Sequence, residues 1–337
     1  MKLVSFQIKT PLGAHLRLGV LDGLGVIDLQ QAYAHRLMST GMSPGAVHRI
    51  SRAVVPTNMV SFIEGGDLSL DAVRDALSWI AAEPDRKSAE GIVYRREQIT
   101  MLAPIPRPPL IRDFMAFEEH LRNIYPKLGR EVPEEWYRLP VYYKGNPASV
   151  GGDGDVVYFP DYADELDFEF ELAAVIGRGG CDIAAETAAN HIYGYMIYND
   201  FSARAIQMRE MSVGLGPAKG KDFVGGHVFG PYLATADEIP DPYQLNMLAR
   251  VNGDTWCQSN SSSMHWKFED MIAHASRSEE IWPGEIFGSG TVGWGSGAER
   301  GELLQSGDSV ALTVDRLGTL TNKVQKRPCP DPGRKAQ

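Results

Sequence analysis

The chain is 337 residues long, which is long for one compact unit, so we expect two domains. Apolar residues make up 43% of it and the formal net charge is −10, a balance that argues against nucleic acid or an anionic membrane as a partner. The three cysteines are widely spaced and form no CxxC pair, which argues against a disulfide framework or a thiolate zinc site. Since the chain shows neither a signal segment nor an apolar run long enough to span a bilayer, we expect a soluble, cytoplasmic protein.

The N-terminal part of the chain shows short apolar runs separated by turn residues. Residues 2–9 and 16–29 have this pattern, which predicts strands joined by turns. Ser69 then precedes an apolar periodicity and suits an N-cap, which predicts a helix over 70–82. We therefore expect residues 1–104 to form a small β-rich N-terminal domain.

A proline-rich segment marks the domain boundary. Four prolines fall between positions 104 and 109, and proline suits neither a helix interior nor a central strand, so we expect a stiff, extended connector. Beyond it the predicted helices cover 112–125, 182–191, 201–211 and 264–277, and the predicted strands cover 156–159, 166–177, 193–199, 228–233, 246–252 and 308–314. Because strands outnumber helices, we expect an α+β fold on a large mixed or antiparallel sheet, followed by a disordered tail over 326–337.

One predicted strand carries acidic residues at every second position. Side chains alternate between the two faces of a strand, so Asp167, Glu169 and Glu171 point one way while the apolar residues between them enter a core. Same-face neighbours lie ~7 Å apart, and like charges at that spacing repel unless water or a cation screens them. Hard cations such as Mg²⁺, Mn²⁺ and Ca²⁺ bind oxygen ligands of this kind. The pattern predicts either a divalent-cation site or a solvated acidic face.

Two further segments favour the cation site. Asp200 ends an apolar strand and leads into a segment in which, if it is helical, Arg204 and Gln207 share one face at the same corner. Asp113 and His120 are seven residues apart, which is two helical turns, so a helix would point both side chains into one cleft.

Together these segments resemble the fumarylacetoacetate hydrolase family. The matching motifs occur in chain order: RDFMAFEEH (112–120), LPVYY (139–143), LDFEFELAAVIG (166–177), YNDFSARAIQ (198–207), GPAKGKDF (216–223), MHWKFEDMIAHAS (264–276) and PGEIFGSGT (283–291). The resemblance covers 105–322, and the N-terminal part resembles the family's smaller β-rich domain. It implies a catalytic domain over 105–325 with that family's mixed β-sandwich roll, and a homodimer.

The resemblance also implies a role for each side chain of the site. Four carboxylates match the family's metal ligands, with Mg²⁺ as the expected ion and Mn²⁺ or Ca²⁺ as alternatives: Asp113, Glu169, Glu171 and Asp200. His120 matches the general base, and Glu299 matches the acid that orients it. Three side chains match residues that bind substrate oxygens and stabilise the oxyanion: Arg204, Gln207 and Lys221. Two more, Tyr143 and Thr291, match further substrate contacts.

This set of residues suits cleavage of a C–C bond between two carbonyls. The leaving carbanion needs a Lewis acid, the attacking water needs a base that works near neutral pH, and the oxyanion needs fixed donors. We therefore expect a divalent-metal-dependent hydrolase acting on a small 1,3-dicarbonyl or acylpyruvate-type molecule that resembles fumarylacetoacetate. Ala205, Met211 and the segment 224–227, which lacks the family's usual threonine, depart from the family around the substrate rather than around the metal.

Two alternatives stay open. One keeps the metal and the fold for lyase-type chemistry: decarboxylation of a 2-oxo acid, hydration of an enol acid, or enol–keto tautomerisation. The presence of His120 favours hydrolysis, because only the water-activating reactions require that base. The other alternative is a non-catalytic relative, which should have lost the base, a ligand or an oxyanion donor; the sequence shows no such loss. The loops over 124–138 and 210–227 carry no selectivity code, so the substrate itself stays open.

Overall fold

The computed structural model describes residues 1–23, 25–83, 85–86 and 91–327. Their strands form a large sheet and a smaller one. The large sheet has the order β4 (Val93–Tyr94), β3 (Gly25–Asp28), β2 (Gly13–Asp22), β1 (Lys2–Thr10), β12 (His227–Thr235), β11 (Ile192–Asp200), β10 (Phe170–Ile176), β15 (Ile286–Gly288), β6 (Ile111–Phe114) and β7 (Tyr142–Gly145), with β5 (Thr100–Met101) beside β1 and β8 (Val150–Gly151) beside β12. The smaller sheet has the order β14 (Asp254–Asn260), β13 (Asn246–Val251), β16 (Ser309–Val314), β17 (Gly318–Gln325) and β9 (Val156–Tyr158).

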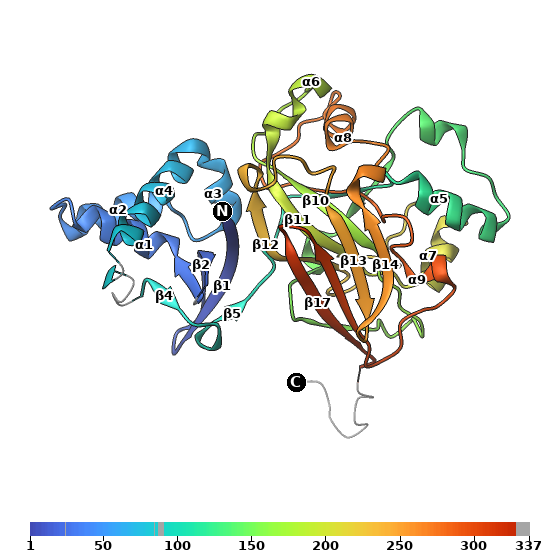
Figure 1. Ribbon diagram of the computed structural model, residues 1–337, viewed down its shortest axis with the longest axis horizontal. Helices are drawn as coiled ribbons and strands as arrows, with labels where there is room; N and C mark the ends of the chain where they lie inside the picture. Colours follow the sequence, from blue (N-terminus) through green and yellow to red (C-terminus); the bar gives the residue numbers. More distant parts are fainter. Residues whose placement is uncertain (24, 84, 87–90, 328–337) are drawn as a thin grey trace.

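Helices lie at both ends of the molecule. The N-terminal region carries α1 (Leu29–Met38), α2 (Pro44–Val54), α3 (Met59–Glu64) and α4 (Gly66–Ala82), which lie at the left in Figure 1. The rest of the chain carries α5 (Glu118–Ile124), α6 (Ala185–Ala188), α7 (Arg204–Met211), α8 (Phe268–Ala275) and α9 (Gly297–Arg300). Helices α5, α7 and α9 gather on one side of the two sheets, at the right of the same view. Parallel pairs such as β15–β6 and β17–β9 occur among antiparallel ones, so both sheets are mixed and the predicted α+β class is confirmed.

The N-terminal region is richer in helix than the expected β-rich domain. Helices α1 to α4 pack beside a meander of short strands, and of these only α4 corresponds to a predicted helix. The caps of two others are readable in the sequence: Asp28 accepts a hydrogen bond from the backbone N–H of Gln31, and Pro44 opens α2. The predicted cap at Ser69 is wrong, because α4 begins three residues earlier and the Ser69 hydroxyl donates instead to the carbonyl of Val54.

The N-terminal strands extend the sheet of the rest of the chain. Strand β1 pairs antiparallel with β12, with Lys2 opposite Ala234 and Leu3 opposite Leu233. The expected division at residue 104 therefore separates two regions that share one sheet. No helix within the described ranges is both long and apolar enough to cross a membrane.

Strand β10 is buried on both faces. Leu172 packs in the hydrophobic core that also contains Leu312 of the smaller sheet, whereas Ala173 packs in the core that contains Phe62 of α3. The alternation predicted for this strand is therefore present, and all seven of its residues are buried. A carboxylate on β10, such as that of Glu171, is consequently held inside the protein.

Several predicted boundaries need correction. The helix predicted over 112–125 is a strand, β6, followed after a short loop by α5, so Asp113 and His120 do not lie two turns apart on one helix. The predicted 166–177 strand is regular only from residue 170, and the residues before it form isolated bridges. In the expected tail over 326–337, the backbone of Lys326 donates to the hydroxyl of Ser306; residues 328–337 lie outside the described residues.

Candidate metal centre and active site

Four carboxylates from three strands meet at one point inside the large sheet. Asp113 lies on β6, Glu171 on β10, Glu169 just before β10, and Asp200 at the end of β11. One oxygen from each lies within 4.8 Å of the others, and all four side chains are buried. We call Asp113, Glu169, Glu171 and Asp200 the carboxylate cluster.

A glycine of the intervening strand β15 makes room for this cluster. A Cβ added at Gly288 would lie 2.5 Å from Oδ1 of Asp113 and 3.0 Å from Oε2 of Glu171, closer than real Cβ contacts. The absence of a side chain on β15 therefore lets the carboxylates of β6 and β10 approach each other across it.

Two members of the cluster are neutralised by cations of the protein. The ammonium of Lys221, itself buried, lies 2.5 Å from Oε2 of Glu169 and 2.5 Å from Oδ2 of Asp200. Arg204 donates to the other oxygen of Glu169. Burial raises the pKa of both acids. Arg204 and Lys221 more than reverse this for Glu169, and Lys221 and His227 do so for Asp200, so both net pKa shifts are downward.

The other two members have no such compensation. Burial, together with the neighbouring carboxylates, raises the pKa of Asp113 and of Glu171 well above their ordinary values. Oδ1 of Asp113 and Oε1 of Glu171 are buried and receive no hydrogen bond from the protein. Buried negative charge without a partner is costly, and hard divalent cations take clustered carboxylate oxygens as ligands. The cluster therefore fits a divalent metal ion, which it could hold.

A histidine–carboxylate pair is the second component of the site. Nδ1 of His120, on α5, lies 3.0 Å from Oε2 of Glu299, on α9. Glu299 also receives hydrogen bonds from Nδ2 of Asn123, the backbone N–H of Trp294, and the backbone and hydroxyl of Ser296. Burial raises the pKa of Glu299, but the contacts with His120, Asn123 and the backbone of Trp294 together more than reverse this, and the net shift is downward. The structure thus brings together the two residues expected to form the general base and its orienting acid.

The expected substrate-binding residues occupy different positions around the cluster. The hydroxyl of Tyr143 donates to Oδ2 of Asp200 at 2.7 Å, and Lys221 contacts two carboxylates as described. The guanidinium of Arg204 makes four hydrogen bonds within the protein, to Asp167, Glu169 and the amide oxygen of Gln207. Arg204 therefore links residues of the site to one another. Thr291 is buried in the segment that follows β15.

Asp167 and His227 belong to the site although no role was predicted for either. Asp167 is fully buried, pairs with Arg204 at 2.6 Å, and accepts the backbone N–H groups of Gly297 and Ala298, so it ties α7 to α9. Its place on the same strand face as Glu169 was the available signal. His227 lies 3.2 Å from Oδ1 of Asp200, and only its place within the atypical 224–227 segment marked it.

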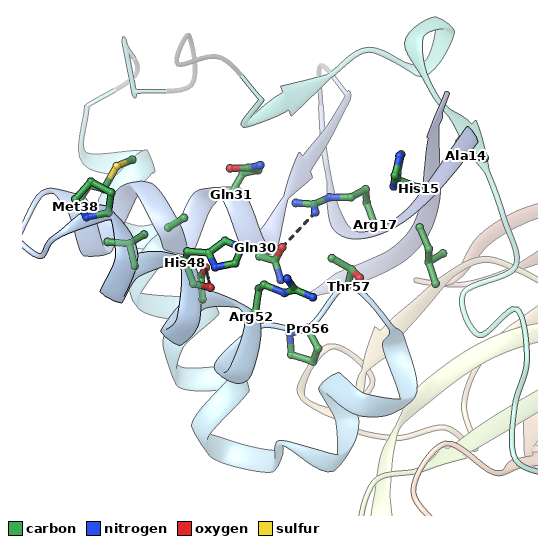
Figure 2. A pocket seen from close by; sticks show the side chains of 15 residues that line it. Ala14, His15, Arg17, Gln30, Gln31, Met38, His48, Arg52, Pro56 and Thr57 are labelled. Carbon is green, nitrogen blue, oxygen red and sulfur yellow. Dashed lines mark hydrogen bonds between the residues drawn. The ribbon is translucent and has the colours of Figure 1, made fainter. Parts of the chain in front are cut away.

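A separate cavity is lined by residues that are distant in sequence from those of the candidate site. It has a volume of about 750 Å³ and is bounded by β2, α1 and α2 of the N-terminal region. Figure 2 shows Arg17, Gln30, His48 and Arg52 around it, with Arg17 donating to Gln30. No predicted site residue lines it, so cavity size does not identify the candidate site in this protein.

Comparison with known proteins agrees with the resemblance. A family model described as the C-terminal domain of fumarylacetoacetate (FAA) hydrolase matches residues 110–325. The chain therefore belongs to the fumarylacetoacetate hydrolase family. Human mitochondrial oxaloacetate tautomerase FAHD2A is 31% identical over 332 residues, which cover 96% of this chain and 91% of that protein. Fumarylacetoacetate hydrolase domain-containing protein 2 of Pongo abelii is 32% identical over the same shares of the two chains.

Solved structures show the same fold. Maleylpyruvate hydrolase from Sphingobium sp. SYK-6, in complex with manganese(II) and pyruvate, has a TM-score of 0.67 at 22% identity and covers 97% of this chain and 99% of its own. Fumarylpyruvate hydrolase from Pseudomonas aeruginosa, in complex with Mn²⁺ and pyruvate, has a TM-score of 0.57 at 24% identity, over 65% of this chain and 91% of its own. The chain is thus a member of an enzyme superfamily that includes hydrolases, tautomerases and isomerases.

Proposed function

We propose that this protein is a divalent-metal-dependent hydrolase that cleaves a C–C bond in an acylpyruvate-type 2-oxo acid. The observation that carries the proposal is the contact of 3.0 Å between His120 and Glu299, in a site that also holds the uncompensated carboxylates of Asp113 and Glu171. A base oriented by a carboxylate suits the activation of water, and buried carboxylate oxygens suit a hard cation. The structures of maleylpyruvate and fumarylpyruvate hydrolases with Mn²⁺ and pyruvate lend further support.

The residues divide the work as follows. Asp113, Glu169, Glu171 and Asp200 would hold the cation, which supplies Lewis-acid polarisation of the 2-oxo acid oxygens when bound. Because Nδ1 of His120 faces Glu299 at 3.0 Å, we assign the proton of the attacking water to Nε2.

The bonds that form and break in the remaining steps are as follows, and the proton taken up by His120 is returned at the end. A C–O bond forms at the acyl carbonyl, and the C–C bond breaks with its electron pair passing to the 2-oxo acid fragment. His120 then returns its proton to that fragment, so the products are a carboxylic acid and pyruvate or a pyruvate derivative. Lys221, a buried cation next to Asp200, would donate to the developing negative charge.

A second candidate is enol–keto tautomerisation of a 2-oxo dicarboxylate. The specific observation in its favour is the identity of 31% over 96% of this chain with the human protein named oxaloacetate tautomerase. His120 is compatible with this reaction too, because tautomerisation moves a proton between carbon and oxygen, but only the reaction that consumes water requires a base to activate it.

One experiment separates the two candidates. Chelator-stripped protein, with and without added Mn²⁺ or Mg²⁺, is mixed with a panel of acylpyruvates and with enol-oxaloacetate. We expect metal-dependent release of pyruvate from at least one acylpyruvate. Metal-dependent loss of the enol absorbance of oxaloacetate, with no cleavage of any acylpyruvate, would establish the tautomerase instead. Full activity after thorough chelation would overturn the metal-dependent mechanism in both forms.

A further inference from the structure

His227 occupies a buried position behind the carboxylate cluster. It is the first residue of β12 and lies opposite Asp200 in the pairing of β11 with β12. Its side chain has no exposed surface. Nδ1 lies 3.2 Å from Oδ1 of Asp200 and 2.8 Å from the hydroxyl of Tyr198, while Nε2 lies 3.0 Å from Oδ1 of Asp222. The imidazole therefore stands between two carboxylates, one of which belongs to the cluster.

The surroundings of the ring leave it little freedom to move. A Cβ added at Gly145 of β7 would lie 3.0 Å from two ring atoms of His227, so the backbone of β7 closes one side. At Nε2 of the ring, the carboxylate of Asp222 is itself held, because it also accepts the backbone N–H of Asn146 at 2.8 Å. The position of the imidazole is thus set by its neighbours, and a fixed ring can fix the carboxylate that it contacts.

The contacts of Asp200 show what this arrangement achieves. Its Oδ2 already accepts hydrogen bonds from Lys221 and Tyr143, whereas its buried Oδ1 receives no hydrogen bond and lies 3.2 Å from Nδ1 of His227. The imidazole is therefore the neighbour that faces the second oxygen of this carboxylate. Lys221 and Asp222 are adjacent, and both backbone N–H groups donate to the carbonyl of Ala218. This turn thus supplies Lys221, which donates to Oδ2 of Asp200, and Asp222, which contacts the histidine facing Oδ1.

We propose that His227, supported by Asp222, is a positioning residue that orients the carboxylate of Asp200 toward the bound cation. This inference rests on the proposed metal-dependent function. Partners that orient a metal-binding side chain contribute ~10–100-fold to metal affinity or activity. His227 holds its ligand from a position where it need not touch the substrate or the cation.

The test is metal affinity, measured by calorimetric titration of Mn²⁺ into the chelator-stripped, full-length protein. Asparagine places its amide near the position of Nδ1, and glutamine places its amide near Nε2. We therefore expect His227→Asn to retain most of the affinity, and His227→Gln and His227→Ala to lose roughly 10–100-fold. Asp222→Asn should weaken binding by a smaller factor, because the histidine stays in place. His191→Ala is the control, since the His191 ring forms its hydrogen bond with the carbonyl of Arg178 rather than with a carboxylate of the cluster, and this change should leave binding unchanged.

The outcomes are distinguishable. Thermal unfolding of each metal-free variant shows whether it folds, and Asp222→Asn, whose side chain is 22% exposed, carries the test if His227→Ala does not. Wild-type affinity in folded His227→Gln and His227→Ala, or in Asp222→Asn if they do not fold, would overturn the positioning role while leaving the metal site intact. Failure of the wild-type protein to bind Mn²⁺ would overturn the proposed function and this inference with it.

Discussion

The carboxylate cluster consists of two halves with opposite surroundings. Glu169 contacts both Arg204 and Lys221, and Asp200 contacts Lys221. Cations of the protein itself therefore compensate the charge of this half. Asp113 and Glu171 form no ion pair within the described part of the chain; each has a buried oxygen that receives no hydrogen bond, as does Asp200 at Oδ1, so the ion pairs are what separate the two halves. In the compensated half the carboxylates are paired with cations of the protein, whereas the ionised form of the other half would need a bound cation to offset its charge. Acidic residues of equal burial can therefore serve different purposes, and their partners distinguish them.

The largest effect should come from a residue outside both halves. His120→Ala removes the proposed base, and general acid–base catalysis contributes ~10²–10⁴-fold, so kcat for acylpyruvate cleavage should fall by that factor. Affinity for Mn²⁺ should stay near the wild-type value, because His120 is not one of the four clustered carboxylates. Steady-state kinetics and calorimetry measure the two quantities. Persistent cleavage would show that another group activates water.

Substitutions that remove a cation from the compensated half should lower the free energy of unfolding of the metal-free protein more than substitutions in the other half. Arg204→Met leaves Asp167 and Glu169 buried without their guanidinium, and breaking a buried pair costs roughly 3–5 kcal/mol. Denaturant unfolding of the metal-free protein measures this loss. Arg209→Met, an exposed position on the same helix, is the control and should change the free energy of unfolding little. Equal stability of the two variants would contradict a structural role for Arg204.

The uncompensated half should respond in the opposite sense. Glu171→Gln removes a buried charge that has no protein cation, so the metal-free protein should be as stable as the wild type or more stable. Its affinity for Mn²⁺ should fall by about 100-fold or more, because a proposed ligand is lost. Calorimetry and denaturant unfolding of the same sample show both effects. Unchanged metal affinity would exclude Glu171 as a ligand.

The smallest expected effect on Mn²⁺ affinity comes from filling the space at Gly288, between the carboxylates of Asp113 and Glu171. Gly288→Ala adds a methyl group 2.5 Å from the present position of Oδ1 of Asp113, which must shift that carboxylate. We expect about a 10-fold weakening of Mn²⁺ binding, at the lower end of the range for changes beside a metal site. Gly45→Ala, where the added atom meets only the end of the Arg49 side chain at 3.8 Å, is the control. Identical affinities of the two variants would show that the cluster tolerates the displacement.

The sequence by itself determined the chemistry-bearing residues and the alternation of β10, because that strand's two-residue period is a local property. It also carried motifs specific enough to indicate the family. Local patterns were less reliable where a segment takes its structure from its neighbours. Residues 111–114 form a strand because they pair with β15 and β7, although a helix had been predicted there.

Tertiary structure alone decided which acids have partners. Asp167 was grouped with Glu169 and Glu171 by periodicity, yet Arg204 and two backbone N–H groups of α9 take up its charge. His227 reaches Asp200 through the pairing of β11 with β12, and Asp222 reaches His227 through a turn. The contacts of Asp167 with Arg204 and of His227 with Asp200 join residues distant in the chain, and neither spacing nor periodicity encodes them. The residue types at the site follow from the sequence, whereas their charge balance follows from the packing.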